Sequence, residues 1–250
     1  MTASPPAEPG TGTAPPDTPN DPDPPDAPAG PGWRRSWHAR SGRLNTSRQW
    51  ALRELAPRHH LPAKTALLRH GTAVAVEIGA GSGEAALALA AQHPDWLVVA
   101  AEVHTASRAT LLLGVDQHDL SNLAVEARDG RDVLAEVAVH RPVDLVRILF
   151  PDPWPKRRHH PRRLVTAELV QLLHQSLHHR GVVELATDDA DYARAIAAAF
   201  HADPRFRPAD PATALPPRPV TYYERRARQA GRAVKTLCYA VHPHSEEIRR

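Results

Sequence analysis

The sequence predicts an α/β protein with a mostly parallel sheet and helices on both of its faces. From Gly71 onward, short apolar runs alternate with longer segments of helical spacing, and this alternation occurs five times. The apolar runs are continuous, which is typical of strands that are buried on both faces. Strands that alternate with helices are joined by right-handed crossovers, so we expect them to lie parallel in one sheet.

The expected elements follow in order along the chain. The strands are residues 72–78, 96–101, 123–127, 143–150 and 181–186, and the helices after them are residues 84–93, 106–115, 132–139, 163–178 and 190–200. The proline-rich stretch 204–219 is expected to be a loop. Residues 220–223 and 233–241 are expected to close the sheet as an antiparallel pair, which gives a seven-stranded sheet.

The N-terminal part differs in composition from this α/β domain, which we assign to residues 71–250. Residues 1–32 hold 11 of the 26 prolines, five acidic residues and no Lys, Arg or His. A segment with so little apolar surface does not offset the entropy of ordering its backbone, so we expect a disordered acidic tail. Residues 33–70 are rich in arginine and tryptophan, and we expect a basic extension that packs beside the sheet.

Composition and charge restrict the class of protein. The whole chain carries a net charge of +3, but residues 33–250 hold 31 basic and 23 acidic residues, which favours a polyanionic partner. Apolar runs are far shorter than the roughly 18–20 residues of a membrane span, and the N-terminus lacks the pattern of a signal peptide. The single cysteine, Cys238, excludes an internal disulfide and cysteine-based zinc sites. We expect a cytoplasmic protein with no membrane contact and no metal, either a monomer or a homodimer.

A glycine-rich turn follows the first expected strand. Gly79, Gly81 and Gly83 allow a ligand to approach the backbone at the start of a helix. A dinucleotide fingerprint requires glycine at position 84, but Glu84 stands there, and a carboxylate at a helix N-terminus repels a pyrophosphate. The loop therefore favours a ligand without a pyrophosphate, such as S-adenosylmethionine. A tight turn with a purely structural role is the alternative.

Three carboxylates lie where such a ligand would need them. Glu77 lies near the end of the first strand, where it can face the cationic methionine part, and Asp129 follows the third strand and can approach the adenine. Glu102 lies 19 residues beyond Gly83, at the end of the second strand, where a carboxylate accepts ribose hydroxyls. Together with the five alternations, these residues favour a Rossmann-like class I methyltransferase.

The fourth strand is followed by a rigid carboxylate and a basic run. Asp152 lies between two prolines, which fix the backbone around it. Residues 156–163 then hold five cationic side chains and two histidines, which suits contact with phosphates; a solvated basic face is the alternative. Trp154, Tyr222 and Tyr223 are candidates for stacking on a base, with core or rim packing as the alternative.

These motifs resemble the bacterial tRNA (guanine-N7)-methyltransferase family over most of residues 40–240. The matching motifs are Gly42-Arg43-Leu44, the Glu-Ile-Gly-x-Gly-x-Gly loop of residues 77–83, Glu102-Val103-His104, Phe150-Pro151-Asp152-Pro153-Trp154, Ala186-Thr187-Asp188, and Arg218-Pro219-Val220-Thr221 with Glu224. The sequence departs from the family pattern at Pro161, where a Lys is usual, and at Tyr222-Tyr223, where Lys-Phe is common.

The resemblance implies transfer of a methyl group from S-adenosylmethionine to N7 of a guanine in tRNA, within the variable loop. It assigns Glu77, Glu102, Asp129 and Asp152 to S-adenosylmethionine, with Asp152 at the catalytic position. It assigns to the RNA Lys156, the run 158–163 with Arg158, His159, Arg162 and Arg163, and then Asp188, Thr221, Tyr222, Tyr223 and Glu224. One alternative is a methyltransferase that acts on another RNA or on a small molecule. Another is a protein that binds RNA without catalysis, but the intact glycine loop and the carboxylates argue against it.

The chemistry of guanine explains why no catalytic base stands out. N7 carries an in-plane lone pair, so its attack on a sulfonium methyl group requires proximity and charge stabilisation rather than removal of a proton. We expect Asp152 to accept hydrogen bonds from guanine N1–H and N2–H. These donors become more acidic as N7 is alkylated, so the bonds would tighten in the transition state.

Overall fold

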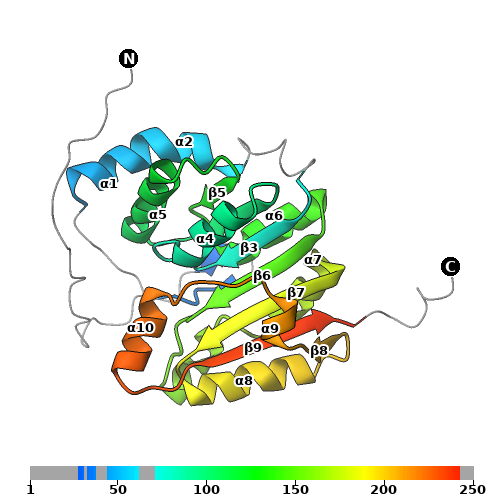
Figure 1. Ribbon diagram of the computed structural model, residues 1–250. Coiled ribbons are helices and arrows are strands. Elements are labelled where there is room, and N and C mark those ends of the chain that lie inside the picture. Colours follow the sequence, from blue (N-terminus) through cyan, green and yellow to red (C-terminus); the bar gives the residue numbers. More distant parts are fainter. Residues whose placement is uncertain (1–27, 31–32, 38–43, 62–70, 243–250) are drawn as a thin grey trace, which may run out of the picture.

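The structure is a computed structural model that describes residues 28–30, 33–37, 44–61 and 71–242 (Figure 1). Within these residues, a seven-stranded sheet has the order β5-β4-β3-β6-β7-β9-β8. The strands are β3 (Val74–Ile78), β4 (Leu97–Ala101), β5 (Leu123–Glu126), β6 (Val143–Leu149), β7 (Leu177–Thr187), β8 (Phe206–Pro208) and β9 (Lys235–Val241). Strands β3 to β7 pair in parallel and β9 is antiparallel to β7 and β8. The predicted α/β fold with a mostly parallel seven-stranded sheet is confirmed.

The order of the strands places a ligand crevice at β3. From β3 the chain moves outward through β4 to β5, and then returns to add β6 and β7 on the other side of β3. The helices that follow β3 and β6 therefore turn away from each other, and open α/β sheets bind their ligands at the carboxyl ends of the strands at such a reversal.

Helices cover both faces of the sheet because successive strand residues point to opposite sides. Val74, Val76 and Ile78 of β3 belong to the larger core, which lies under α6 (Gly130–His140), α7 (Ala167–Ser176) and α8 (Ala190–His201). Ala75 points to the smaller core on the other face. That core includes side chains from α4 (Glu84–Gln92), α5 (Thr105–Gln117) and the π-helical turn η1 (Ala51–Leu55).

Part of the N-terminal region is described. The turn η1 lies between α1 (Thr46–Trp50) and α2 (Ala56–His59), and this helical segment packs against α5. Strand β1 (Pro28–Gly30), within the predicted tail, pairs with β2 (Trp33–Arg34). The rest of the predicted tail, and residues 38–43 and 62–70 of the predicted extension, lie outside the described residues.

The C-terminal part differs from the prediction. Residues 220–223 do not form a strand: the side chain of Thr221 accepts a hydrogen bond from the backbone N–H of Glu224 and caps α10 (Tyr222–Gln229). The sheet instead takes its last edge strand, β8, from the predicted loop 204–219, which also contains α9 (Pro211–Ala214). A run of β-branched and aromatic residues favoured a strand, but the Thr-x-x-Glu capping pattern determines the helix.

The predicted helix 163–178 is shorter than expected. The basic run forms the 3₁₀ helix η3 (Arg157–Arg162), α7 begins after the Thr166 cap, and residues from Leu177 onward already belong to β7. In Figure 1, α10 lies beside the ends at which β6 and β7 finish. No helix in the described part of the chain has the length and hydropathy to cross a membrane.

Candidate active site

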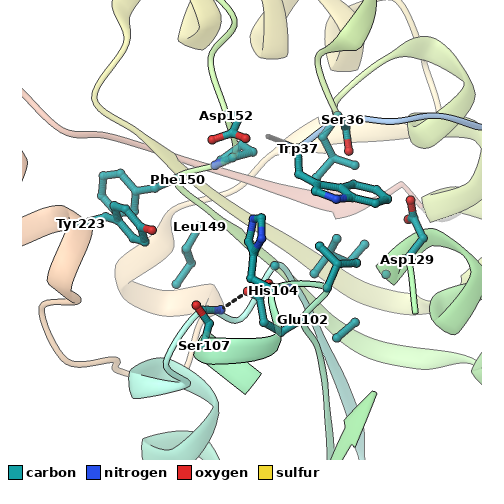
Figure 2. A pocket seen from close by; sticks show the side chains of 18 residues that line it. Ser36, Trp37, Glu102, His104, Ser107, Asp129, Leu149, Phe150, Asp152 and Tyr223 are labelled. Atoms are coloured by element: carbon teal, nitrogen blue, oxygen red, sulfur yellow. Dashed lines mark hydrogen bonds between the residues drawn. The ribbon is translucent and has the colours of Figure 1, made fainter. Parts of the chain in front are cut away.

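A pocket lies at the carboxyl ends of β3, β4, β5 and β6. Five of the predicted cofactor residues line it: Gly79, Gly81, Glu102, Asp129 and Asp152. Figure 2 shows that the last three surround the pocket from different elements. A smaller adjoining pocket shares Gly79, Gly81, Leu149, Phe150 and Tyr223 with the first and also contains the sixth predicted residue, Glu77.

The glycine loop has a backbone that only glycine adopts readily. Gly79, Gly81 and Gly83 have φ angles of 76°, 58° and 85°. At Gly83 there is also no space for a side chain, because a Cβ atom would lie 2.2 Å from Cδ1 of Leu111. The loop therefore keeps the start of α4 close to α5 and leaves the backbone of residues 79–81 open to the pocket.

Glu102 is buried at the end of β4 and is held by two backbone donors. The N–H of Gly81 binds its Oε2 at 2.6 Å, and the N–H of His104 binds its Oε1 at 2.7 Å. A carboxylate accepts about four hydrogen bonds, so this one still has acceptor capacity for ribose hydroxyls. It also fixes the distance between the glycine loop and the end of β4.

Asp129 is buried and is bound by Arg131. Its Oδ1 accepts from the backbone N–H and Nε of Arg131, at 2.9 and 3.0 Å, and its Oδ2 lies 2.6 Å from Nη2 of the same residue. The guanidinium of Arg131 also donates to the backbone carbonyl of Arg34 and lies 4.7 Å from the ring centre of Trp33. Asp129 thus attaches an N-terminal segment to the pocket, and its contact with adenine stays a prediction.

The N-terminal segment 33–37 closes one side of the pocket. Ser36 and Trp37 line the cavity, and Figure 2 shows the indole of Trp37 beside Asp129. The indole N–H of Trp33 binds Oδ1 of Asp132 at 3.1 Å. The spacing of residues along the sequence did not indicate that Ser36 and Trp37 line the pocket. The one signal in the sequence was a tryptophan within an arginine-rich segment.

The loop after β6 presents Asp152 to the pocket. Phe150 has a φ of 53°, which is unusual for a residue with a side chain, and its N–H binds the carbonyl of Ala186 at 2.8 Å. This local turn, followed by Pro151 and Pro153, brings the half-buried Asp152 carboxylate to the pocket wall (Figure 2).

Trp154 does not offer a stacking surface for a base. Its side chain is 2% exposed, and its indole N–H donates to the carbonyl of Ser36 at 3.1 Å. The guanidinium of Arg162 lies 5.0 Å from its ring centre. The alternative of core packing is therefore correct for this residue, and its role is to join the Asp152 loop to segment 33–37.

The basic run divides into exposed and buried members. Lys156, Arg157 and Arg158 are exposed, whereas Arg163 is only 6% exposed. Arg163 donates to the carbonyl of Pro153 at 2.9 Å and pairs with Asp191 at 2.7 Å. Its expected contact with RNA is not supported by this placement, because the guanidinium already anchors the Asp152 loop to α8. His159 and Arg162 are half-buried.

The segment 218–224 forms another wall of the site, and we call it the receiving segment. Thr221 and Glu224 were expected to contact RNA, but both are buried: Thr221 caps α10, and Glu224 pairs with Arg218 and Arg228. Tyr223 lines both pockets and is 39% exposed, and Tyr222 is half-buried.

Two acidic residues, Glu84 and Asp188, also pair with arginines that follow this segment in the sequence. Glu84 holds the receiving segment from the start of α4, because it accepts the N–H of Tyr222 and pairs with Arg225, both at 2.5 Å. Asp188 pairs with Arg232 at 2.7 Å, and the neighbouring Asp189 caps α8. The expected contact of Asp188 with guanine stays a prediction.

Glu77 suits a cationic ligand. It is buried, and burial raises the pKa of its carboxyl group to about 7. Among the described residues its Oε2 has no hydrogen-bond partner, although it lies in the wall of the adjoining pocket. A buried carboxylate oxygen without a donor is unfavourable, and an ammonium group in the pocket would satisfy it.

The described residues contain no cluster of three His, Cys, Asp or Glu that would suit a metal ion.

Comparisons with known proteins agree with this geometry. A family model described as "Putative methyltransferase" matches residues 71–237. The chain is 42% identical over 164 residues to the tRNA (guanine-N(7)-)-methyltransferase of Mycobacterium avium, covering 64% of this chain and 63% of that protein. It is 36% identical over 208 residues to the protein of the same name from Nitrosospira multiformis, covering 80% and 91%.

The match to the mycobacterial protein thus spans less than two thirds of that protein's length. Among solved structures, the 16S rRNA methyltransferase KamB has a TM-score of 0.51 at 16% identity, covering 74% of this chain and 95% of that chain, which shows a shared fold. The family model and the long alignment with the Nitrosospira protein together identify the family. This chain belongs to the tRNA (guanine-N(7)-)-methyltransferase family.

Proposed function

We propose that this protein transfers a methyl group from S-adenosylmethionine to N7 of a guanine in tRNA. One observation carries the proposal: Asp152 lies on the wall of the same pocket that holds the glycine loop and Glu102. A methyl donor seated on that loop would therefore have a carboxylate beside it at the pocket wall. The names of the related proteins support tRNA as the substrate and guanine N7 as the acceptor.

The pocket and the smaller one beside it together offer partners for each part of the donor. When bound, S-adenosylmethionine supplies an electrophilic methyl group on a sulfonium centre. Glu77 would hold the ammonium of the methionine part, and Glu102 would accept the ribose hydroxyls. The wall formed by Ile78, Trp37 and Asp129 would enclose the adenine. Glu77 Oε2, which has no hydrogen-bond partner among the residues that the structure describes, and the remaining acceptor capacity of Glu102 fit this assignment.

Asp152 orients the guanine and stabilises the charge that develops on it. Its carboxylate accepts hydrogen bonds from N1–H and N2–H, and these strengthen as positive charge spreads into the purine. Charge-assisted hydrogen bonds contribute roughly 1.5–3 kcal/mol, which corresponds to about 10- to 150-fold in rate. The lone pair of N7 is already available, so Asp152 does not have to remove a proton.

The exposed cations hold the RNA backbone. Lys156, Arg157 and Arg158 lie a few residues after Asp152, at the start of η3, and we assign them to phosphates near the target guanine. Tyr223 lies at the pocket mouth, where its exposed ring can stack on a displaced base. We further propose that the target guanine lies in the variable loop of tRNA and that the protein acts in the cytoplasm.

A labelling experiment tests the proposal. The pure protein is incubated with methyl-labelled S-adenosylmethionine and unmodified tRNA, and the RNA is then cleaved chemically at N7-methylguanine. We expect one labelled guanine, within the variable loop. Label at another atom of the tRNA would contradict the assignment, and a tRNA that stays unlabelled would favour another RNA or a small molecule as the substrate.

A further inference from the structure

Three charged side chains lie side by side across the centre of the sheet. Glu77 on β3 is in register with Arg147 on β6, which is in register with Glu184 on β7. Their neighbours along the strands belong to the core under α6, α7 and α8, so these three side chains point to the opposite face. All three are at most 5% exposed. We call Glu77, Arg147 and Glu184 the charged row.

Arginines connect this row to the receiving segment. Glu184 is shared: Arg147 Nε binds its Oε2 and Arg218 Nε binds its Oε1, both at 2.6 Å. Arg218 then binds Oε2 of Glu224 through Nη1, also at 2.6 Å. In addition, Arg147 donates to the carbonyl of Pro216 at 2.8 Å. Arg218 thus fixes the first residue of the receiving segment to the sheet and pairs that residue with the last one, Glu224.

Two atoms of the charged row are left without hydrogen-bond partners in the part of the chain that the structure describes. Within the described residues, neither Glu77 Oε2 nor Arg147 Nη1 has a hydrogen-bond partner, although both atoms are buried. Arginine and glutamate are seldom buried so deeply without pairing, because each unpaired charge costs free energy. Well-packed apolar residues at these three positions would stabilise the sheet at least as well as the buried charges do. This favours a functional reason for the charged row.

We propose that Arg218 is a positioning residue for RNA recognition, which holds the receiving segment on the charged row and so sets Tyr222 and Tyr223 at the mouth of the pocket. The inference rests on the proposed function, because it assigns this wall to the RNA. Arg218 itself is enclosed between Glu184 and Glu224, and it acts through the segment rather than by touching the guanine.

The aromatic side chains explain why the position of this segment matters. The ring of Tyr223 lies 6.4 Å from that of Phe150, two residues before Asp152, and is nearly parallel to it. A shift of the receiving segment would change the width of the pocket between Tyr223 and the Asp152 loop. Ordering this wall before the RNA arrives lowers the entropy lost on binding.

The test compares Arg218→Gln with Arg218→Lys and with Arg205→Gln. Arg147 is 1% exposed and its replacement endangers folding, whereas Arg218 lies nearer the surface. Arg205 pairs with Asp203 at 2.6 Å beside β8, at the far edge of the sheet, so its loss controls for removing an ion pair of equal length. Thermal unfolding shows first that each variant is folded.

Hydrogen exchange gives a readout that does not depend on the substrate. We expect Arg218→Gln to speed amide exchange in residues 220–224 by roughly tenfold, with partial rescue in Arg218→Lys and no change in Arg205→Gln. Unchanged exchange in Arg218→Gln would overturn the inference, even if wild-type protein proved not to bind tRNA and the proposed function failed.

Binding gives the second readout. We expect Arg218→Gln to raise the Kd for unmodified tRNA about tenfold while the Kd for S-adenosylmethionine changes less than about twofold. With a wild-type protein that binds tRNA, an unchanged tRNA Kd, an equal loss in both Kd values, or the same loss in Arg205→Gln would overturn the inference.

Discussion

The indole N–H of Trp154 donates a hydrogen bond to the backbone carbonyl of Ser36, at a distance of 3.1 Å. The two residues are 118 positions apart in the sequence, and each belongs to a segment that lines the pocket. This one contact therefore joins the loop that carries Asp152 to the N-terminal segment that closes the cofactor side.

Replacing Trp154 by Phe tests that connection. The aromatic ring is retained, but the carbonyl of Ser36 loses a buried donor, so we expect the free energy of unfolding to fall by about 1–3 kcal/mol in chemical denaturation. Trp33→Phe is the matched control, because it removes an indole bond to the half-buried Asp132, which water can replace. An equal loss of stability in both variants would contradict a special role for the Trp154 contact.

Trp37 is expected to contribute to cofactor affinity. Its indole faces the pocket beside Asp129 (Figure 2), and the loss of an aromatic contact weakens binding by about 1 kcal/mol, or roughly fivefold. We expect Trp37→Ala to raise the Kd for S-adenosylmethionine in calorimetry by this factor. Trp96→Ala, which removes an indole stacked on His93 away from the pocket, should leave the Kd unchanged. Equal effects would point to a general loss of stability.

Glu77 should make cofactor binding depend on pH. Burial raises the pKa of this carboxyl group to about 7, and only the ionised form attracts an ammonium group. The ionised fraction rises as the pH increases through this value, and the ligand's own α-amino group stays mostly protonated up to about pH 7, so we expect S-adenosylmethionine to bind about fivefold more tightly at pH 7 than at pH 6. Calorimetry at both values measures the ratio. In Glu77→Gln the ratio should approach one, and a wild-type ratio near one would contradict the assignment.

The same shift predicts a change in stability. The unfolded carboxyl group ionises near its ordinary pKa of 4.5, whereas the folded one keeps its proton up to about 7. Unfolding therefore releases a proton in this window, and the contribution of Glu77 to stability falls as the pH rises from about 4.5 to 7. We expect Glu77→Gln to gain stability relative to the wild type over this range, measured by denaturation at pH 5 and pH 8.

The exposed cations at the start of η3, Lys156, Arg157 and Arg158, should give tRNA binding a steep dependence on salt. Each phosphate contact contributes a slope of about 0.7 to 0.9 in log Kd against log salt concentration. We expect Lys156→Ala and Arg158→Ala each to reduce the slope by about one such contact, and S-adenosylmethionine binding to stay flat with salt. Arg180→Ala, an exposed arginine near the amino end of β7, should leave the slope unchanged. A flat response of the wild type would exclude a phosphate track.

Local patterns predicted the sheet and the centre of the site. The strands β3 to β7 are continuous apolar runs, and the glycine loop, Glu102, Asp129 and Asp152 all follow strand ends, so one rule of topology brings them together. Residues 220–223 of the receiving segment were predicted wrongly as a strand, because their β-branched and aromatic side chains outweighed the capping pattern of Thr221 and Glu224.

Contacts between distant segments were not predictable in the same way. Arg163 looks like any other member of a basic run until the fold places Asp191 beside it, 28 residues further on. Ser36 and Trp37 lie in a segment whose composition indicates charge rather than a pocket wall. The pairing of Arg147 with Glu184 requires the register of β6 and β7, which spacing alone does not give.

Asp152→Asn is the most direct test of the account. The amide keeps the size of the side chain but loses the charge, so the stabilisation of the alkylated guanine should fall. We predict that single-turnover methylation of tRNA slows by about 10- to 150-fold while the Kd for S-adenosylmethionine, measured on the same preparation, changes by less than about threefold. Equal losses in rate and in cofactor affinity would show that Asp152 only holds the donor, and an unchanged rate would contradict its role altogether.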